Sequence, residues 1–342
     1  MAEMKAAQIL QKYDGPPVRI MEVCGTHTHE IFRQGIRRIL PAKITLISGP
    51  GCPVSVTPAG FIDETVSLAL EHGCTICTFG DLVRVPGTSM SLADARGQGA
   101  KVRVVYAPAD AAEYAAGHPE EQVVFLSVGF ETTTPASCIA VEKAAALDNF
   151  SLLTAGKTMP AAYDAMRHST DLFLYPGHVH AITGTGICEK LAEEGVSGVC
   201  AGFTASELLT ALAVAVTRFE KGEPFFVNCY PRVVKREGSP AARRLVERIM
   251  EPCDSEWRGI GVLPMSGMKL RDKYARYDAR RKFSLPPMHG RSNPACRCGE
   301  VLQGKCLPRD CSLFGKVCTP EHPVGACMVS GEGACSAFYL YG

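Results

Sequence analysis

Short, almost continuously apolar runs alternate with longer amphipathic segments along the first two thirds of the chain. Such runs, rich in β-branched residues, are typical of strands that are covered on both faces. Eight runs are predicted as strands, at residues 18–23, 43–48, 75–79, 102–107, 122–128, 150–155, 171–176 and 196–201. Segments with helical periodicity lie between them, at residues 29–40, 58–72, 133–147 and 204–220. This alternation predicts an α/β fold of parallel sheets with helices on both faces.

A polar, alanine-rich segment, residues 108–121, separates the first four predicted strands from the last four. We therefore expect two similar α/β domains, at residues 1–112 and 113–230. Beyond residue 230 the chain is first basic and helical in pattern, and after residue 283 it is rich in Pro, Gly and Cys. Residues 231–342 are expected to form a helical, cysteine-rich C-terminal region.

The charge balance and cysteine content narrow the classes of function. The 342 residues include 36 basic and 35 acidic ones, for a net charge of +1, so no basic excess favours nucleic acid as a partner. No apolar run approaches the roughly 20 residues of a membrane-spanning helix, and the opening segment is too polar for a secretory signal. We expect a cytoplasmic protein without membrane contact. Sixteen cysteines in a reducing compartment favour metal binding or thiol chemistry over disulfides.

The cysteines are concentrated near the C-terminus, where seven fall within 40 residues, at positions 296, 298, 306, 311, 318, 327 and 335. A loop-rich segment of this kind has a weak core, so a metal centre or cross-link is expected to hold it together. Structural zinc is one interpretation, but zinc sites usually show two close Cys-x2-Cys pairs. The wide, varied spacing here fits the four thiolates of an iron–sulfur cluster better. The surplus cysteines favour a dithiol nearby.

Two further cysteines lie in loops that follow predicted strands. Cys24, in MEVCGTHTHE, comes directly before a helix that Thr26 or Thr28 can cap. Ligands bind at the carboxyl ends of parallel strands, and the positive end of a helix dipole favours a thiolate there. Cys52, in GPGCPVSVTP, repeats the arrangement after the next strand. If the two strands are neighbours, Cys24 and Cys52 face one cleft.

Other polar residues in these loops have two interpretations. His27 and His29 are candidate donors or ligands beside Cys24, or they pack and cap the loop. Asp81, in FGDLVRVPG, and Glu131, in GFETTTP, either line a cleft or cap a helix. The stretch PGHVHAITGTG looks like a phosphate loop but lacks the Gly-x4-Gly-Lys-Ser/Thr pattern, so it does not establish a nucleotide site.

Cys74 and Cys77 have the Cys-x-x-Cys spacing of a redox pair but fall within a predicted strand. Residues three apart in a strand point to opposite faces, so both are interpreted as buried core residues. The same interpretation applies to Cys138, Cys188, Cys200, Cys229 and Cys253.

Several long motifs, taken together, resemble the HypD family of hydrogenase maturation factors. The resemblance runs in order from about residue 18 to residue 341. It rests on MEVCGTHTHE, GPGCPVSVTPAGFID, TFGDLVRVPG, GFETTTP, PGHVHAITG, WRGIGVLPMSGMKL and the tail CSLFGKVCTPEHPVGACMVSGEGACSAFYLY.

The resemblance implies a cytoplasmic scaffold, or metallochaperone, for [NiFe]-hydrogenase assembly, with no definite enzyme class. Such a protein carries one iron ion together with a small HypC-like partner. The iron receives two cyanides, delivered by a HypE-like donor, and one carbon monoxide, before transfer to the hydrogenase large subunit. By motif, Cys24 holds the iron and Cys52 is a second functional thiol in the same cleft. Thr26, His27 and Asp81 would surround them.

The tail resembles the cluster region of ferredoxin–thioredoxin reductases, in which a [4Fe-4S] cluster lies beside a redox disulfide. On that pattern the redox pair is Cys298 and Cys327, and Cys306 has no role. The implied cluster ligands are Cys296, Cys311, Cys318 and Cys335. An alternative function is therefore an iron–sulfur thiol–disulfide reductase.

The chain departs from the family pattern at Ser55, where the family usually has a second cysteine, in GPGCPVC. A serine cannot form a disulfide with Cys52, so a relay of thiols through such a pair is in doubt. The role implied for Cys24 does not depend on it.

Overall fold

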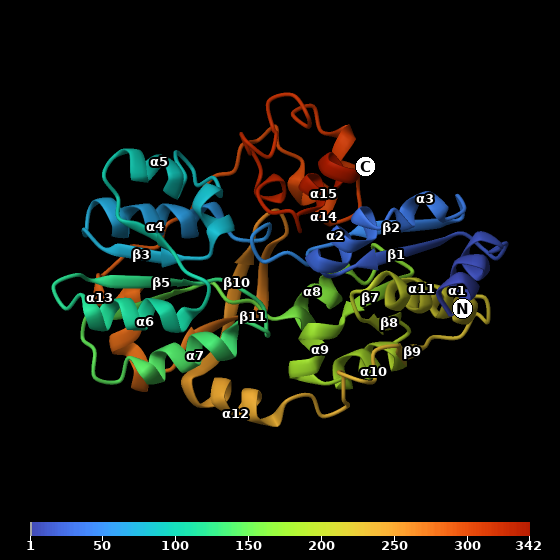
Figure 1. Ribbon diagram of the computed structural model, residues 1–342, viewed down its shortest axis with the longest axis horizontal. Coiled ribbons are helices and arrows are strands. Elements are labelled where there is room, and N and C mark those ends of the chain that lie inside the picture. The colour runs from blue at the N-terminus through green and yellow to red at the C-terminus, as the bar shows by residue number, and fades with distance from the viewer. Residues whose placement is uncertain (1) are drawn as a thin grey trace.

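The computed structural model describes residues 2–342, and two parallel β-sheets organise it (Figure 1). Sheet A has five strands in the order β2-β1-β7-β8-β9, and sheet B has four in the order β4-β3-β5-β6. The strands of sheet A are β1 (Val18–Glu22), β2 (Ile44–Ser48), β7 (Leu172–Pro176), β8 (Ser197–Ala201) and β9 (Phe226–Asn228). Those of sheet B are β3 (Thr75–Thr78), β4 (Val102–Val104), β5 (Val123–Ser127) and β6 (Phe150–Thr154). The predicted α/β class is confirmed, and all eight predicted strands are present.

Helices cover both faces of each sheet, as the continuous apolar runs require. The core on one face of sheet A includes side chains of α1 (Ala2–Gln11), α2 (Gly25–Arg33), α3 (Ile36–Ile39) and α11 (Ala205–Phe219). The core on its other face includes side chains of α8 (Met159–Met166), α9 (Gly177–Thr183) and α10 (Gly186–Glu193). One face of sheet B is covered by α4 (Ala59–Leu70), η1 (Gly80–Arg84), α5 (Leu92–Gly97) and α13 (Ala279–Lys282). Its other face is covered by α6 (Pro108–Gly117), α7 (Thr134–Lys143), α12 (Pro240–Ile249) and η2 (Asp272–Tyr277).

The chain does not complete one sheet before it starts the other. It builds β1 and β2 of sheet A, crosses to build all of sheet B, and returns to add β7, β8 and β9. The predicted division of the strands near residue 112 is therefore wrong. The segment interpreted as a divider forms α6, whose buried face includes Ala111, Ala112 and Ala115 and packs on sheet B.

An antiparallel hairpin, β10 (Met250–Trp257) and β11 (Gly261–Leu270), lies between the two sheets (Figure 1). Met250 and Leu270 belong to a core of sheet B, whereas Trp257 belongs to a core of sheet A. The helical prediction for residues 231–283 is wrong for the two strands of this hairpin, although the range also contains α12 and α13. The side chains of β10 alternate between exposed and more buried positions, which is the period of a strand, and the exposed ones include charged residues.

The cysteine-rich region packs above the junction of the two sheets (Figure 1). It contains α14 (Cys298–Leu302), η3 (Pro308–Asp310), η4 (Ala326–Met328) and α15 (Ala334–Tyr341). Its helices contact α2 and β2 of sheet A, and Arg84 of η1 donates hydrogen bonds to the carbonyls of Pro320 and Val329.

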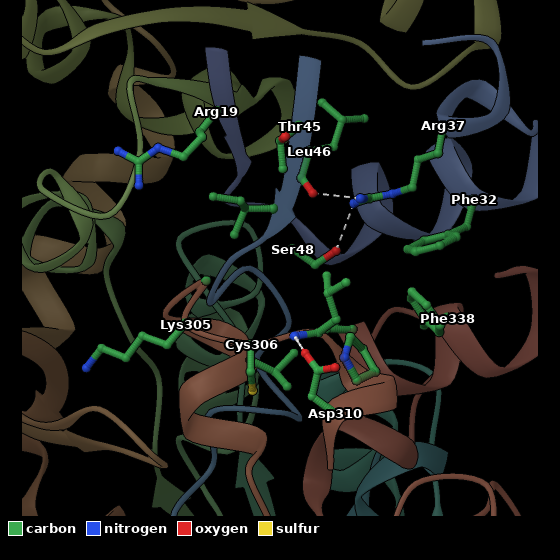
Figure 2. Close-up of a pocket in the computed structure, with 16 residues that line it drawn as sticks. Arg19, Phe32, Arg37, Thr45, Leu46, Ser48, Lys305, Cys306, Asp310 and Phe338 are labelled. Carbon is green, nitrogen blue, oxygen red and sulfur yellow. Dashed lines mark hydrogen bonds between the residues drawn. The ribbon is translucent and has the colours of Figure 1, made fainter. Parts of the chain in front are cut away.

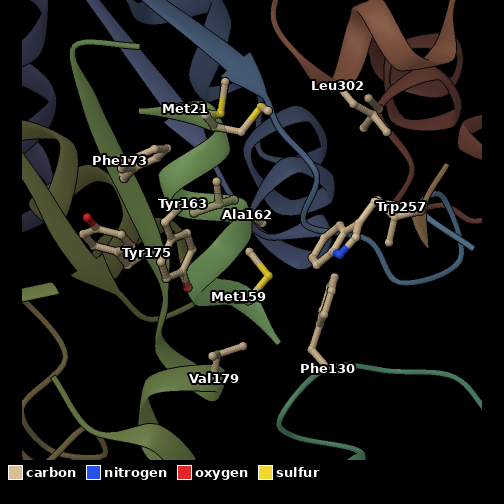
Figure 3. Close-up of a cluster of buried hydrophobic side chains, with 14 of the residues drawn as sticks. Met21, Phe130, Met159, Ala162, Tyr163, Phe173, Tyr175, Val179, Trp257 and Leu302 are labelled. Carbon is tan, nitrogen blue, oxygen red and sulfur yellow. The ribbon is translucent and has the colours of Figure 1, made fainter. Parts of the chain in front are cut away.

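A single core joins sheet A, the hairpin and the cysteine-rich region (Figure 3). Tyr163 and Tyr175 pack edge to face on the sheet side, and Phe130 stacks on Trp257 on the hairpin side. Leu302 of α14 belongs to the same core. The cysteine-rich region is therefore anchored by hydrophobic burial, which holds it in place over the loops of sheet A.

Candidate functional site

The two cysteine loops meet at the carboxyl edge of sheet A. Strands β1 and β2 pair in parallel from Val18 opposite Ile44 to Glu22 opposite Ser48, so their following loops leave the sheet side by side. The N–H of Gly25 donates to the carbonyl of Gly51, with 2.9 Å between the atoms. This bond joins the loop of Cys24 to the loop of Cys52, as expected for loops that follow neighbouring parallel strands.

Cys24 begins α2, where the sequence predicted a threonine cap. It is the N-cap residue, and its Sγ accepts a hydrogen bond of 3.4 Å from the backbone N–H of His27. The thiol is 1% exposed, and burial raises the pKa of Cys24 to about 12. Burial thus acts against the thiolate that the helix dipole was expected to favour. Desolvation of the charged form outweighs the hydrogen bond from the helix start.

Cys52 is also buried, at 3% exposure, and neither thiol lines an open cleft. Burial raises the pKa of Cys52 to about 11, although the neighbouring Ser55 side chain lowers it in part. Ser55 is fully buried on the same turn, beside the Cys52 thiol.

Two histidines lie beside Cys24, one of which the sequence analysis did not single out. Nε2 of His178, at the start of α9, is 4.0 Å from Sγ of Cys24, and its ring stacks on Phe203. His27 also packs on Phe203, and its Nε2 donates to the carbonyl of Gly202. Burial lowers the pKa of His27 to about 3 and that of His178 to about 4, so both rings are neutral.

A carboxylate from the cysteine-rich region covers the two thiols. Glu332 accepts a 2.7 Å hydrogen bond from the hydroxyl of Thr26, and its negative charge raises the pKa of both Cys24 and Cys52. A Cβ at Gly25 would lie only 2.8 Å from Cβ of Glu332 and 3.0 Å from Cβ of Cys52, so the close packing requires glycine. The only sequence signal for Glu332 is an acid between two glycines in the tail motif.

Six of the C-terminal cysteines line one small apolar cavity: Cys296, Cys298, Cys311, Cys318, Cys327 and Cys335. Cys298 and Cys327 form a disulfide with Cα atoms 6.3 Å apart, and they are the pair that the resemblance implied. The backbone N–H of Val324 donates to Sγ of Cys318 at 3.4 Å. Hydrogen bonds to sulfur and an apolar lining are features of iron–sulfur sites, so these residues fit a cluster.

Within residues 2–342, no three His, Cys, Asp or Glu side chains are arranged to hold a single metal ion. A four-iron cluster needs a different arrangement, because each thiolate binds a different iron and the sulfur atoms lie farther apart than around one ion. Cys306 is outside the six-cysteine cavity. It lines a separate cavity of about 340 Å³ between β2 and the cysteine-rich region, near Lys305 and Asp310 (Figure 2).

The structure does not bring the two candidate acids to the thiols. Asp81 is exposed on η1, and none of the hydrogen bonds among residues 2–342 links it to a cysteine loop. Glu131 accepts a hydrogen bond from the N–H of Met159, in the segment that returns to sheet A. Burial raises the pKa of Glu131 to about 7.

Cys74 and Cys77 are both fully buried and belong to cores on opposite faces of sheet B. Their interpretation as core residues is confirmed. Cys138, Cys188 and Cys200 are likewise buried, whereas Cys229 and Cys253 are only partly buried.

The fold and site together define a two-sheet α/β protein in which a cysteine-rich segment covers two buried thiols at a sheet edge. No helix among residues 2–342 is long and apolar enough to cross a bilayer.

Comparison with known proteins identifies the family. The family model described as "Hydrogenase formation hypA family", HypD, matches residues 1–342. The chain is 42% identical over 356 residues to the hydrogenase maturation factor HypD of Azotobacter vinelandii, which covers 100% of this chain and 94% of that protein. It is also 42% identical over 335 residues to HypD of Escherichia coli K12, covering 95% and 89% of the two chains. The chain belongs to the HypD family of hydrogenase maturation factors.

Proposed function

We propose that this chain is a cytoplasmic scaffold on which, together with a HypC-like partner, an iron ion acquires two cyanides and one carbon monoxide. Cys24 holds this iron, a HypE-like donor delivers cyanide, and the finished group passes to the hydrogenase large subunit. One observation supports the scheme above others. A single short segment, residues 327–333, runs from the six-cysteine cavity to the two thiols of sheet A.

Cys24 suits the role of iron ligand by chemistry and by position. A soft thiolate is a good ligand for an iron that also binds cyanide and carbon monoxide. A coordinating thiol is deprotonated by the metal itself, so burial of Cys24 does not prevent binding. His27 and His178 are neutral and adjacent, which leaves the thiolate as the anionic ligand from sheet A. Cys52 provides a second thiol for an incoming ligand or a partner's cysteine.

We assign the cluster ligands to Cys296, Cys311, Cys318 and Cys335. When bound, a [4Fe-4S] cluster would supply electrons, one at a time, to the neighbouring disulfide between Cys298 and Cys327, whose reduction to two thiols takes two electrons and two protons. The disulfide between Cys298 and Cys327 leaves these four cysteines free within the same cavity. Gly333 packs so closely on the backbone of Cys327 that a side chain there would clash, which fixes Glu332 in its position over the thiols.

The same disulfide supports a second candidate function, an iron–sulfur thiol–disulfide reductase. In that case Cys298→Ser abolishes reduction of a small disulfide substrate by the reduced protein. Ser55 weighs against this function as the main one, because the pair that would relay electrons from Cys52 is missing.

Genetic complementation tests the scaffold. In a strain that lacks its own family member, the wild-type chain restores hydrogenase activity and Cys24→Ala does not. Cys138→Ala is the matched control, because Cys138 is equally buried but lies in α7, on sheet B. Full activity with Cys24→Ala would refute the proposal. If Cys24→Ala retains activity and Cys298→Ser loses it, the reductase is favoured.

A further inference from the structure

Arg258 is a buried cation without a carboxylate partner. Arg258 lies in the turn between β10 and β11 and is only 6% exposed. Nε donates to the hydroxyl of Ser292 at 3.1 Å, and Nη2 donates to the carbonyl of Pro86 at 2.8 Å. Nη1 is buried and has no hydrogen-bond partner among the described residues.

Other partly buried arginines of the chain are paired. Arg37 bonds the carboxylate of Glu22 at 2.6 Å, and Arg280 bonds that of Glu64 at 2.7 Å. No carboxylate of residues 4–342 forms an ion pair with Arg258. Removing a guanidinium from water without a counter-charge is costly, and burial lowers the pKa of Arg258. A buried guanidinium that forms no ion pair can act as the counter-charge of an anionic group bound nearby.

The surroundings of Arg258 point to the six-cysteine cavity. Ser292 lies in the segment that leads into Cys296, and Gly259 packs directly against Gly299 of α14. The carbonyl of Gly259 accepts a 2.8 Å hydrogen bond from the side chain of Gln303. The turn that carries Arg258 is therefore packed against the chain on both sides of Cys298.

Charge effects agree with this placement. Among the acidic groups near Arg258, Cys296 has the largest effect on its pKa, ahead of Asp63 and Glu256. Conversely, Arg258 lowers the pKa of Cys296, which burial otherwise raises. The carboxylate of Asp63 accepts two hydrogen bonds from Thr88 and forms no ion pair with Arg258.

The backbone of Arg258 is also bonded to the loop that follows Cys52. The backbone N–H of Arg258 donates to the carbonyl of Val56 at 2.9 Å, four residues after Cys52. Arg258 thus lies where the Cys52 loop, the loop at Pro86 and the segment leading to Cys296 meet.

We propose that Arg258 is the counter-charge of the iron–sulfur cluster and that it favours the reduced state of that cluster. The inference rests on the cluster assigned above. A cluster held by four thiolates is anionic, and one-electron reduction adds a further negative charge without breaking a bond or moving a proton. A fixed, buried cation stabilises the reduced state more than the oxidised one. Arg258 therefore tunes the reduction potential without binding the iron.

The test is an anaerobic redox titration monitored by electron paramagnetic resonance. Arg258→Gln removes the charge and keeps a polar side chain, Arg258→Lys keeps the charge, and Arg309→Gln removes an exposed charge from the same region. We expect Arg258→Gln to disfavour reduction about tenfold or more, which is about 59 mV for one electron. Arg258→Lys and Arg309→Gln should stay within a fraction of that shift.

Several outcomes overturn the inference. An unchanged potential in Arg258→Gln contradicts it, and so does an equal shift in Arg309→Gln. If Arg258→Gln fails to retain a cluster, Arg258→Lys decides: a retained cluster of wild-type potential supports a role of the charge, and a lost cluster contradicts it. A wild-type protein without four irons and four sulfides per chain would refute the cluster assignment itself, which is a different failure.

Discussion

The ion pair between Arg37 and Glu22 allows a quantitative prediction about the stability of the fold beneath the two cysteine loops. Glu22 is fully buried at the end of β1, two residues before Cys24, and Arg37 of α3 bonds it at 2.6 Å. Arg37 also donates to the carbonyl of Leu46 and to the hydroxyl of Ser48 (Figure 2). The pair thus ties β1, β2 and α3 together below the cysteine loops.

Arg37→Met leaves a buried carboxylate without its cation. Thr28 and Ser48 still donate to one oxygen of Glu22, but the other oxygen loses its partner. Breaking a buried pair costs about 3–5 kcal/mol. Because the Arg37 side chain is 24% exposed, we expect the lower end, about 3 kcal/mol in the free energy of unfolding.

Urea denaturation of the reduced protein, followed by circular dichroism, measures this loss. Arg33→Met is the matched control, since Arg33 forms a surface pair with Glu30 on α2 and should cost less than about 1 kcal/mol. In the double variant Glu22→Gln/Arg37→Met, the total loss should be well below the sum of the single losses. Equal losses in Arg37→Met and Arg33→Met would refute this reasoning.

Three further predictions concern single side chains. Burial lowers the pKa of Lys157 from 10.5 to about 7, so between these pH values the unfolded chain holds a proton that the folded chain lacks, and stability rises with pH. Lys157→Met should remove a slope of up to about 1.4 kcal/mol per pH unit, measured as the difference from wild type between about pH 7 and 9. Gly25→Ala should lower the unfolding free energy by about 1–3 kcal/mol, because its Cβ clashes with Glu332. Thr26→Val removes a hydrogen bond to that carboxylate and should speed alkylation of Cys24 about tenfold, measured by mass spectrometry of the iron-free protein.

Each of these predictions has a control. Lys316→Met changes an exposed lysine and should leave the pH slope intact. Gly97→Ala adds a Cβ that meets nothing within 4 Å, so stability should not fall as it does at Gly25. Alkylation of Cys138 should be the same in Thr26→Val and wild type. A Gly25→Ala protein as stable as wild type would mean that the cysteine-rich segment does not press on the loops.

The strands were predicted well, because a buried parallel strand appears in the sequence as a short, continuous run of apolar residues. It did not predict which strands pair. Strand β1 has β7 as a neighbour, and the choice between that strand and a nearer one depends on contacts across the whole chain. The hairpin was missed for a related reason. Strand β10 is partly exposed and contains charged residues, so its pattern resembles a helix surface.

For the site, the sequence predicted the residues that stand out in a local motif, but it did not predict those that distant segments bring to the site. The order of strands and turns placed Cys24 and Cys52 at one edge of a sheet. The raised pKa of Cys24 was not predictable, because the segment that buries it lies some 300 residues away in sequence and includes Glu332. His178 and Arg258 were missed for the same reason. His178 begins a helix and Arg258 lies in a turn, and the importance of each appears only from partners distant in sequence.

Infrared spectroscopy tests the central claim most directly. The chain is coexpressed with its HypC-like partner and the other maturation factors, and the complex is purified without oxygen. We predict absorption bands of metal-bound cyanide and carbon monoxide in the wild-type and Cys138→Ala complexes, and their loss in Cys24→Ala. Bands of full intensity in the Cys24→Ala complex would contradict the assignment of Cys24 as the residue that holds the iron.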